Sequence, residues 1–217
     1  MTRGYTMYEF VSGPLFWISL AICVAGSIYK LVTVIKLARK DKVVLPYMRL
    51  SYSLKSIGRW ITPFGTRSMR LTPIFTAVAF SFHICLLFTP LLLLAHHELL
   101  GIRLIHLPDP VAHVMTAIVI IGGLFFLQRR LLVPYVNNVT YFSDILLLLL
   151  VMAPFVTGFL AYYQWFDYRT VITLHMIFGC VMLVIIPFTR IVHMLFFALT
   201  RAYMACEFGY VRNSQDW

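Results

Sequence analysis

Long apolar stretches separated by short polar segments run along this chain of 217 residues. Four of these stretches contain no Asp, Glu, Lys or Arg: Leu71–His97, Pro110–Gln128, Ile145–Phe166 and Thr170–Thr189. A fifth stretch, Glu9–Lys36, is interrupted only by Lys30 near its end. A helix that crosses a bilayer needs about 20 mostly apolar residues. The pattern therefore predicts an all-α membrane bundle of five transmembrane helices.

The predicted spans cover about 9–36, 71–98, 110–131, 143–164 and 170–200. Residues 37–70 form a basic loop between the first two spans, and residues 1–217 are expected to form a single membrane domain. Pro90 is expected to kink the second span, because proline removes a backbone N–H and clashes with the preceding turn.

Composition and charge extend this picture. Hydrophobic residues make up 61% and charged residues 12%, against about 45–50% and 25% in soluble domains. This excess of apolar residues agrees with a membrane protein.

The basic residues are unevenly distributed. Nine of the 18 Lys and Arg residues lie in 36–70, whereas the opposite side of the predicted bundle has only Arg3, Arg103 and Arg169. Basic loops remain in the cytoplasm, so we expect the N-terminus outside and the C-terminus in the cytoplasm. The basic residues flank spans, so membrane lipid is the expected partner and nucleic acid is not. The loop could also dock a cytoplasmic subunit.

Histidines inside the predicted spans indicate a haem protein. His175 and His193 are 18 positions apart, which is five full turns of a continuous helix, so both would leave one face roughly 27 Å apart along its axis. The second span runs in the opposite direction. It therefore places His83 at the depth of His193, and the neighbouring His96 and His97 at the depth of His175. Two bis-histidine haems at two membrane levels would follow, with iron that transfers electrons.

Geometry alone leaves the partner of His175 ambiguous and slightly favours His97. On a straight helix His97 lies about 40° from the face of His83 and His96 about 140° away, but Pro90 makes this phase unreliable.

Arg190 lies three residues before His193 and either pairs with a haem propionate or extends to headgroups. Gly179, one turn after His175, would let a porphyrin or another helix approach closely. A quinone site at the outer end would draw on the polar and aromatic residues there: His97, Glu98, Arg103, Tyr162, Tyr163 and Gln164.

Motifs in the last span resemble a known family. They are HxxxG at His175–Gly179 and PFTRIVH at Pro187–His193, and the earlier segments Gly122–Gly123, Arg129–Leu131 and Ser143–Leu146 add to them. Together they resemble the gamma subunit of respiratory nitrate reductases, a membrane cytochrome b. The resemblance covers about residues 70–217.

Further stretches resemble homologous subunits in sulfate-reducing bacteria: Phe82–Leu87, Pro90, Ala95–His96, Leu107–Asp109 and Thr157–Ala161. The best match is the cytochrome b-like subunit of the high-molecular-weight cytochrome c complex, followed by that of the transmembrane cytochrome c3 complex. In this pattern the histidine after alanine is retained, which favours His96 over His97. Another alignment would pair His83 with His175 and lose one haem, but the similar distances of His83 and His193 from the inner side favour two.

The resemblance implies an electron-transfer subunit of the bacterial inner membrane. It would hold two haem b groups on the pairs His83–His193 and His96–His175, and would exchange electrons with menaquinone. Its partners would be iron–sulfur and other membrane subunits and a multihaem cytochrome c. The alternatives are a structural membrane anchor that has lost haem, and a small transporter.

Overall fold

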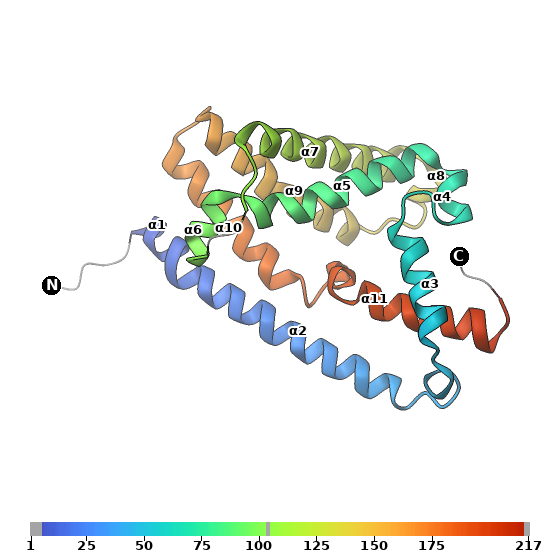
Figure 1. Ribbon diagram of the computed structural model, residues 1–217. Coiled ribbons are helices and arrows are strands. Elements are labelled where there is room, and N and C mark those ends of the chain that lie inside the picture. Colours follow the sequence, from blue (N-terminus) through green and yellow to red (C-terminus); the bar gives the residue numbers. More distant parts are fainter. Residues whose placement is uncertain (1–5, 103–104, 215–217) are drawn as a thin grey trace. The chain divides into compact units, whose positions relative to one another are not determined.

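The computed structural model describes residues 6–102 and 105–214, and these form helices and no strand (Figure 1). Arg3 and Arg103, which the charge pattern assigns to the outer side, lie outside these ranges. Within them, six helical segments are long and apolar enough to cross a membrane: Met7–Ala38, Pro73–Leu92, Asp109–Leu132, Phe142–Tyr163, Tyr168–Ile185 and Arg190–Val211. The chain is thus an all-helical, multi-pass membrane protein. The predicted count of five spans and the predicted sides of the termini are not confirmed.

Three of the predicted spans correspond to helical segments with bounds that differ by a few residues. The first consists of α1 (Met7–Phe10), the π-helical turn η1 (Val11–Leu15) and α2 (Phe16–Ala38). The π turn contains Pro14, which cannot donate the backbone hydrogen bond of a regular helix. The others are α7 (Asp109–Leu132) and α9 (Phe142–Tyr163), joined through the short α8 (Pro134–Asn137).

The second predicted span is divided near its outer end. Helix α5 (Pro73–Leu92) contains Pro90, and Leu93 is extended with φ −78° and ψ 128° before α6 (Leu94–Leu100) begins. The break is therefore three residues after the proline at which the sequence predicts a kink. It leaves the last carbonyls of α5 without helical N–H donors. The rings of His96 and His97 form hydrogen bonds with two of these carbonyls.

The fifth predicted span, 170–200, is not one continuous helix. Helix α10 (Tyr168–Ile185) ends before Pro187, and the 3-10 turn η3 (Arg190–Val192) leads into α11 (His193–Met204). Pro187 has no N–H to donate and its ring would clash with the turn before it, which explains the interruption. The five-turn phase relation predicted between His175 and His193 therefore does not apply.

The helices form two compact units, and each is described by itself. Unit 1 comprises residues 1–16 and 78–182, and unit 2 comprises 17–77 and 183–217. In unit 1, α7 and α9 lie side by side (Figure 1). Gly123 of α7 faces Met152 of α9 so closely that an added Cβ would lie 2.7 Å from Met152 Cγ. Glycine at such a contact lets membrane helices approach closely.

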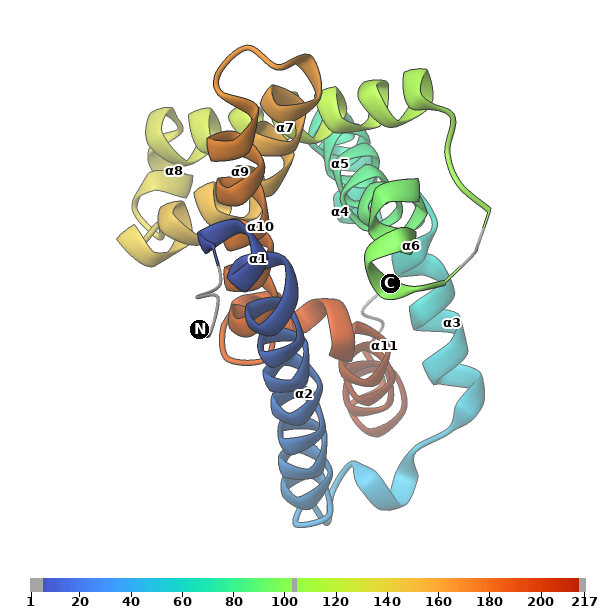
Figure 2. The same cartoon turned by 90° about the vertical axis from the view of Figure 1, so that its left-hand side faces the viewer.

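Unit 2 contains the basic loop, which is more ordered than the sequence predicts. It includes the turn η2 (Leu45–Tyr47), α3 (Leu50–Ile61) and α4 (Arg67–Leu71). Helix α3 packs against α11 and against the π-helical end of the chain, η4 (Ala205–Val211) (Figure 2). The loop is thereby held to the C-terminal segment.

Candidate functional site

Two histidine rings face each other inside unit 1. The ring centroids of His96, on α6, and His175, on α10, are 6.0 Å apart, and the ring planes are inclined by 15°. Both side chains are half-buried. These are the two residues that the sequence pairs at the outer level, so the structure brings together one of its two predicted histidine pairs.

Backbone carbonyls fix the orientation of both rings. His96 Nδ1 donates to the carbonyl of Pro90 at 2.8 Å, which is one of the acceptors exposed by the end of α5. His175 Nδ1 donates to the carbonyl of Pro154 at 2.9 Å. A carbonyl only accepts, so each Nδ1 carries the proton and each Nε2 keeps its lone pair in the neutral ring. This is the usual state of a metal-binding histidine, whose second nitrogen is held by a hydrogen bond.

Gly158 of α9 lies against the ring of His175. A Cβ added at Gly158 would lie 3.0 Å from Cε1 and 3.1 Å from Nδ1 of His175. Any larger residue would therefore press on the ring and on its bond to Pro154. The structure thus places this glycine against a candidate ligand.

A cavity of about 630 Å³ opens beside the two histidines and lies within unit 1. Its size is within the range of about 300–1,000 Å³ that is common for ligand sites. Around His96 and His175 the wall is largely apolar, with contributions from Pro90, Phe155 and Phe159. Such a lining suits a large flat apolar ligand within a membrane helix bundle.

Polar groups line another part of the same cavity. Three of the predicted quinone-site residues, Glu98, Tyr162 and Gln164, contribute to it. Asp109 and His113, which are not among the predicted quinone-site residues, line it as well. The Tyr162 hydroxyl donates to Asp109 Oδ2 at 3.4 Å. The His113 ring lies 4.1 Å from the Tyr162 ring, and its buried Nε2 has no hydrogen-bond partner among the residues that the structure describes. No local sequence pattern predicts these contacts, because they join different helices.

The neighbouring His97 has a different environment. It is buried, its Nε2 donates to the Leu91 carbonyl at 2.6 Å, and its Nδ1 has no partner. It satisfies another terminal carbonyl of α5 and does not line the cavity. The geometry therefore agrees with the choice of His96 as the residue that faces His175.

The other predicted pair, His83 and His193, is divided between the two units. His83 belongs to unit 1 and donates through Nδ1 to the Ala79 carbonyl at 2.7 Å. His193 belongs to unit 2 and donates through Nδ1 to the carbonyl of Arg190, another predicted site residue, at 2.8 Å. In both rings Nδ1 carries a proton, because a carbonyl oxygen can only accept. Their pairing stays a prediction.

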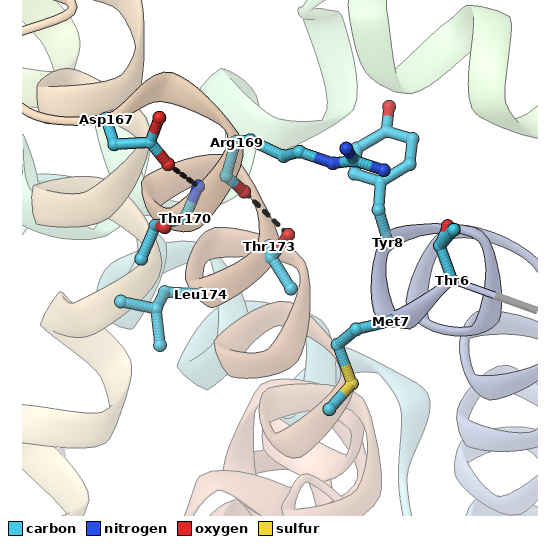
Figure 3. Close-up of a pocket in the computed structure, with 8 residues that line it drawn as sticks. All are labelled: Thr6, Met7, Tyr8, Asp167, Arg169, Thr170, Thr173 and Leu174. Atoms are coloured by element: carbon cyan, nitrogen blue, oxygen red, sulfur yellow. Dashed lines mark hydrogen bonds between the residues drawn. The ribbon is translucent and has the colours of Figure 1, made fainter.

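A second cavity, of about 460 Å³, lies in unit 1 between the start of the chain and α10 (Figure 3). The Asp167 carboxylate accepts from the backbone N–H of Thr170 at 2.8 Å. Hydrogen bonds from Thr170 hold the pKa of Asp167 below its usual range. Arg169 and Tyr8 are among the residues that line this cavity (Figure 3). None of the predicted haem ligands lines this cavity.

One relative defines the family of the chain. A protein from Nitratidesulfovibrio vulgaris strain Hildenborough is 34% identical over 216 residues, which is 95% of this chain and 96% of the relative. The chain belongs to the family of this protein, whose name, "Protein", states no function. No established family model and no solved structure matches the chain.

The residues at the His96–His175 site fit a metal held between two imidazoles. A metal–imidazole bond is about 2 Å long and the ring nitrogen lies about 1 Å from the ring centre, so two axial imidazoles have centroids roughly 6 Å apart. The observed separation of 6.0 Å therefore leaves room for a metal between the two rings. A Cβ at Gly179 would have no other atom within 4 Å, which leaves open space one turn beyond His175. Among residues 6–102 and 105–214, no three His, Cys, Asp or Glu side chains gather as a multi-ligand metal centre, and bis-histidine ligation needs only two.

Proposed function

We propose that this chain is the b-type haem subunit of a quinone-linked respiratory complex in a bacterial inner membrane. It would carry electrons between the menaquinone pool and iron–sulfur and multihaem cytochrome c subunits. The resemblance to nitrate reductase gamma subunits, and above all to the cytochrome b-like subunit of the high-molecular-weight cytochrome c complex, motivates this proposal. The observation that carries it is the opposed pair His96 and His175, 6.0 Å apart beside a large cavity among apolar helices.

His96 and His175 would hold one haem b through Nε2, with Pro90 and Pro154 fixing the two rings through Nδ1. A bound haem supplies one-electron chemistry, and bis-histidine ligation leaves no open axial position for oxygen. The chain itself contributes orientation and an apolar surrounding. Each of these contributions tunes a redox potential.

A second haem would be held by His83 and His193 at the inner level. Arg190 would pair with a propionate of that haem through a charge-assisted hydrogen bond. The break at Pro187 starts a new helix at His193 and places Arg190 in the turn before it.

The polar part of the large cavity supports quinone exchange at the outer haem. Tyr162, Asp109 and His113 lie together there, and Glu98 lines the same wall. Hydroxyl, carboxylate and imidazole groups can bind a quinone oxygen and move its protons.

A reduced-minus-oxidised optical spectrum of the purified chain tests the proposal. We expect b-type bands after reduction with dithionite, two haems per chain, and partial reduction by a menaquinol analogue. A chain that is folded and free of haem would support the anchor or the transporter. A chain with haem that no quinol reduces would contradict the link to the quinone pool.

A further inference from the structure

Helix α3 carries an aliphatic stripe that the protein leaves exposed. Leu50, Leu54, Ile57 and Ile61 fall within an arc of about 60° at 3.6 residues per turn. Leu50 is 73% exposed, and Leu54 and Ile61 are each 58% exposed. Ile57 between them is half-buried, so the exposed surface consists of Leu50, Leu54 and Ile61. These three side chains are aligned along the whole helix, which differs from scattered exposed residues and requires an explanation.

The buried side of α3 is a different face, and it contains the aromatic residues. Ser53 and Ser56 are buried there, and the Ser53 hydroxyl donates to the Ala202 carbonyl of α11 at 3.4 Å. The Arg201 guanidinium lies 4.4 Å above the Trp60 ring, and the Tyr52 ring centroid is 5.6 Å from that of Tyr210. These contacts fix the rotation of α3 within unit 2, so the direction of the aliphatic stripe is determined.

Positive charges occupy the side away from the stripe. Lys55 and Arg59 project roughly 130–170° from its middle, and nine Lys and Arg residues lie in Lys36–Arg70. The chain connects α3 to α2, which ends at Ala38, and to α5, which begins at Pro73, through short linkers. Both of these helices are long and apolar enough to cross a membrane, so α3 is tethered at both ends to the bilayer surface.

We propose that α3 is an interfacial helix that inserts its Leu50–Leu54–Ile57–Ile61 stripe among acyl chains and binds anionic lipid headgroups through Lys55 and Arg59. An amphipathic helix with aliphatic and basic faces lies in the plane of the interface in this manner. Each basic residue near an anionic surface contributes on the order of 1 kcal/mol, which is about fivefold in binding. Protein interfaces concentrate Trp, Tyr and Arg at their centre, but the aromatic residues of α3 already face its own unit. Lipid is therefore the occupant, and the inference does not depend on haem.

Spin labels on the full-length chain in lipid nanodiscs test this arrangement. Labels at Leu54→Cys and Leu50→Cys report on the stripe, and a label at Arg59→Cys reports on the opposite face. The unsubstituted chain, carried through the same labelling, corrects for its own cysteines. Oxygen dissolves in the acyl region and a nickel chelate in water, so the ratio of the two accessibilities measures depth. We expect this ratio to be several-fold higher at Leu54 and Leu50 than at Arg59.

Two results would overturn the proposal. Equal accessibility of Leu54 and Arg59 to the nickel chelate would place the stripe in water. Exclusion of both reagents from Leu54 and Leu50 would mean that protein covers it. The headgroup contribution is tested separately with discs of purely zwitterionic lipid and with the K55Q/R59Q chain in anionic discs. We expect the shielding of Leu54 to decrease in both cases, and shielding that is independent of lipid charge and of the two residues would rule out anionic headgroups as the ligand.

Discussion

His96 and His175 lie with their ring centroids 6.0 Å apart, and the Nδ1 of each ring donates to the carbonyl of a proline residue, Pro90 or Pro154. The two prolines lie in α5 and α9, and the two histidines lie in α6 and α10, so four helices of unit 1 meet at this pair. The arrangement fixes both rings before any ligand binds. Such preorganisation is what a haem site in a membrane bundle requires.

The first prediction separates the two adjacent histidines of α6. His96→Ala should remove the haem of this site, because only His96 faces His175. His97→Ala should keep that haem and instead destabilise the protein, because it removes a buried ring and leaves the Leu91 carbonyl without its donor. Haem per chain and thermal unfolding, measured on both variants, check this. The reverse pattern would transfer the ligand role to His97.

The second prediction concerns the space beside His175. Gly158→Val should displace the ring, since even a Cβ would lie 3.0 Å from Cε1, and we expect about 1–3 kcal/mol of destabilisation from overpacking together with weakened haem binding. Gly58→Ala is the matched control, because a Cβ at Gly58 of α3 meets nothing within 4 Å. Haem retention during purification distinguishes the two. Full haem retention in Gly158→Val would show that the ring does not depend on this glycine.

The third prediction addresses the α7–α9 contact. Gly123→Ala should destabilise the chain by about 1–3 kcal/mol, because the added Cβ would lie 2.7 Å from Met152 Cγ and 2.8 Å from Cε. Met152→Ala should relieve this clash, so the double variant should be more stable than the sum of the two single changes predicts. Thermal unfolding in detergent measures the coupling. Strict additivity would mean that the methionine moves aside without cost.

The sequence predicts those features of this molecule that depend on neighbouring residues along the chain. The apolar stretches predict α7 and α9 to within a few residues, because membrane burial imposes length and composition on each helix separately. The antiparallel order of the spans also places His96 and His97 at the depth of His175. It was the resemblance, and not the helix phase, that favoured His96 over His97.

Features that depend on tertiary packing were not predictable in the same way. The break between Ile185 and Arg190 cancels the five-turn relation of His175 and His193, although Pro187 is visible in the sequence. Helix α3 lies within a segment predicted only as a loop, and packing on α11 stabilises it. His113 is placed beside Tyr162 by two helices that meet, and no spacing along the chain signals that contact.

The fourth prediction concerns the acid response of Asp41, a carboxylate just after the first candidate span. The Tyr203 hydroxyl and the N–H groups of Val43 and Val44 donate to Asp41, and these hydrogen bonds lower the pKa of Asp41. A lowered pKa contributes stability that is present above the unfolded value of about 3.9 and is lost as the pH falls through the folded value. Thermal unfolding between pH 6 and pH 3, at about one-unit intervals, should therefore show a smaller loss in Tyr203→Phe than in the wild type. If thermal stability falls equally with pH in Tyr203→Phe and in the wild type, the Tyr203–Asp41 hydrogen bond does not contribute to the acid response.

Haem content of the purified chain is the most direct test of the proposed ligation. Pyridine haemochrome analysis of the wild type, His175→Ala and His193→Ala at equal protein concentration gives the ratio of haem to chain. We predict two haem b groups in the wild type and one in each variant. The optical spectra of the two variants should differ, because each variant keeps a different haem site. A wild type without haem, or a His175→Ala chain with an unchanged haem ratio, would contradict the assignment of the His96–His175 pair as axial ligands.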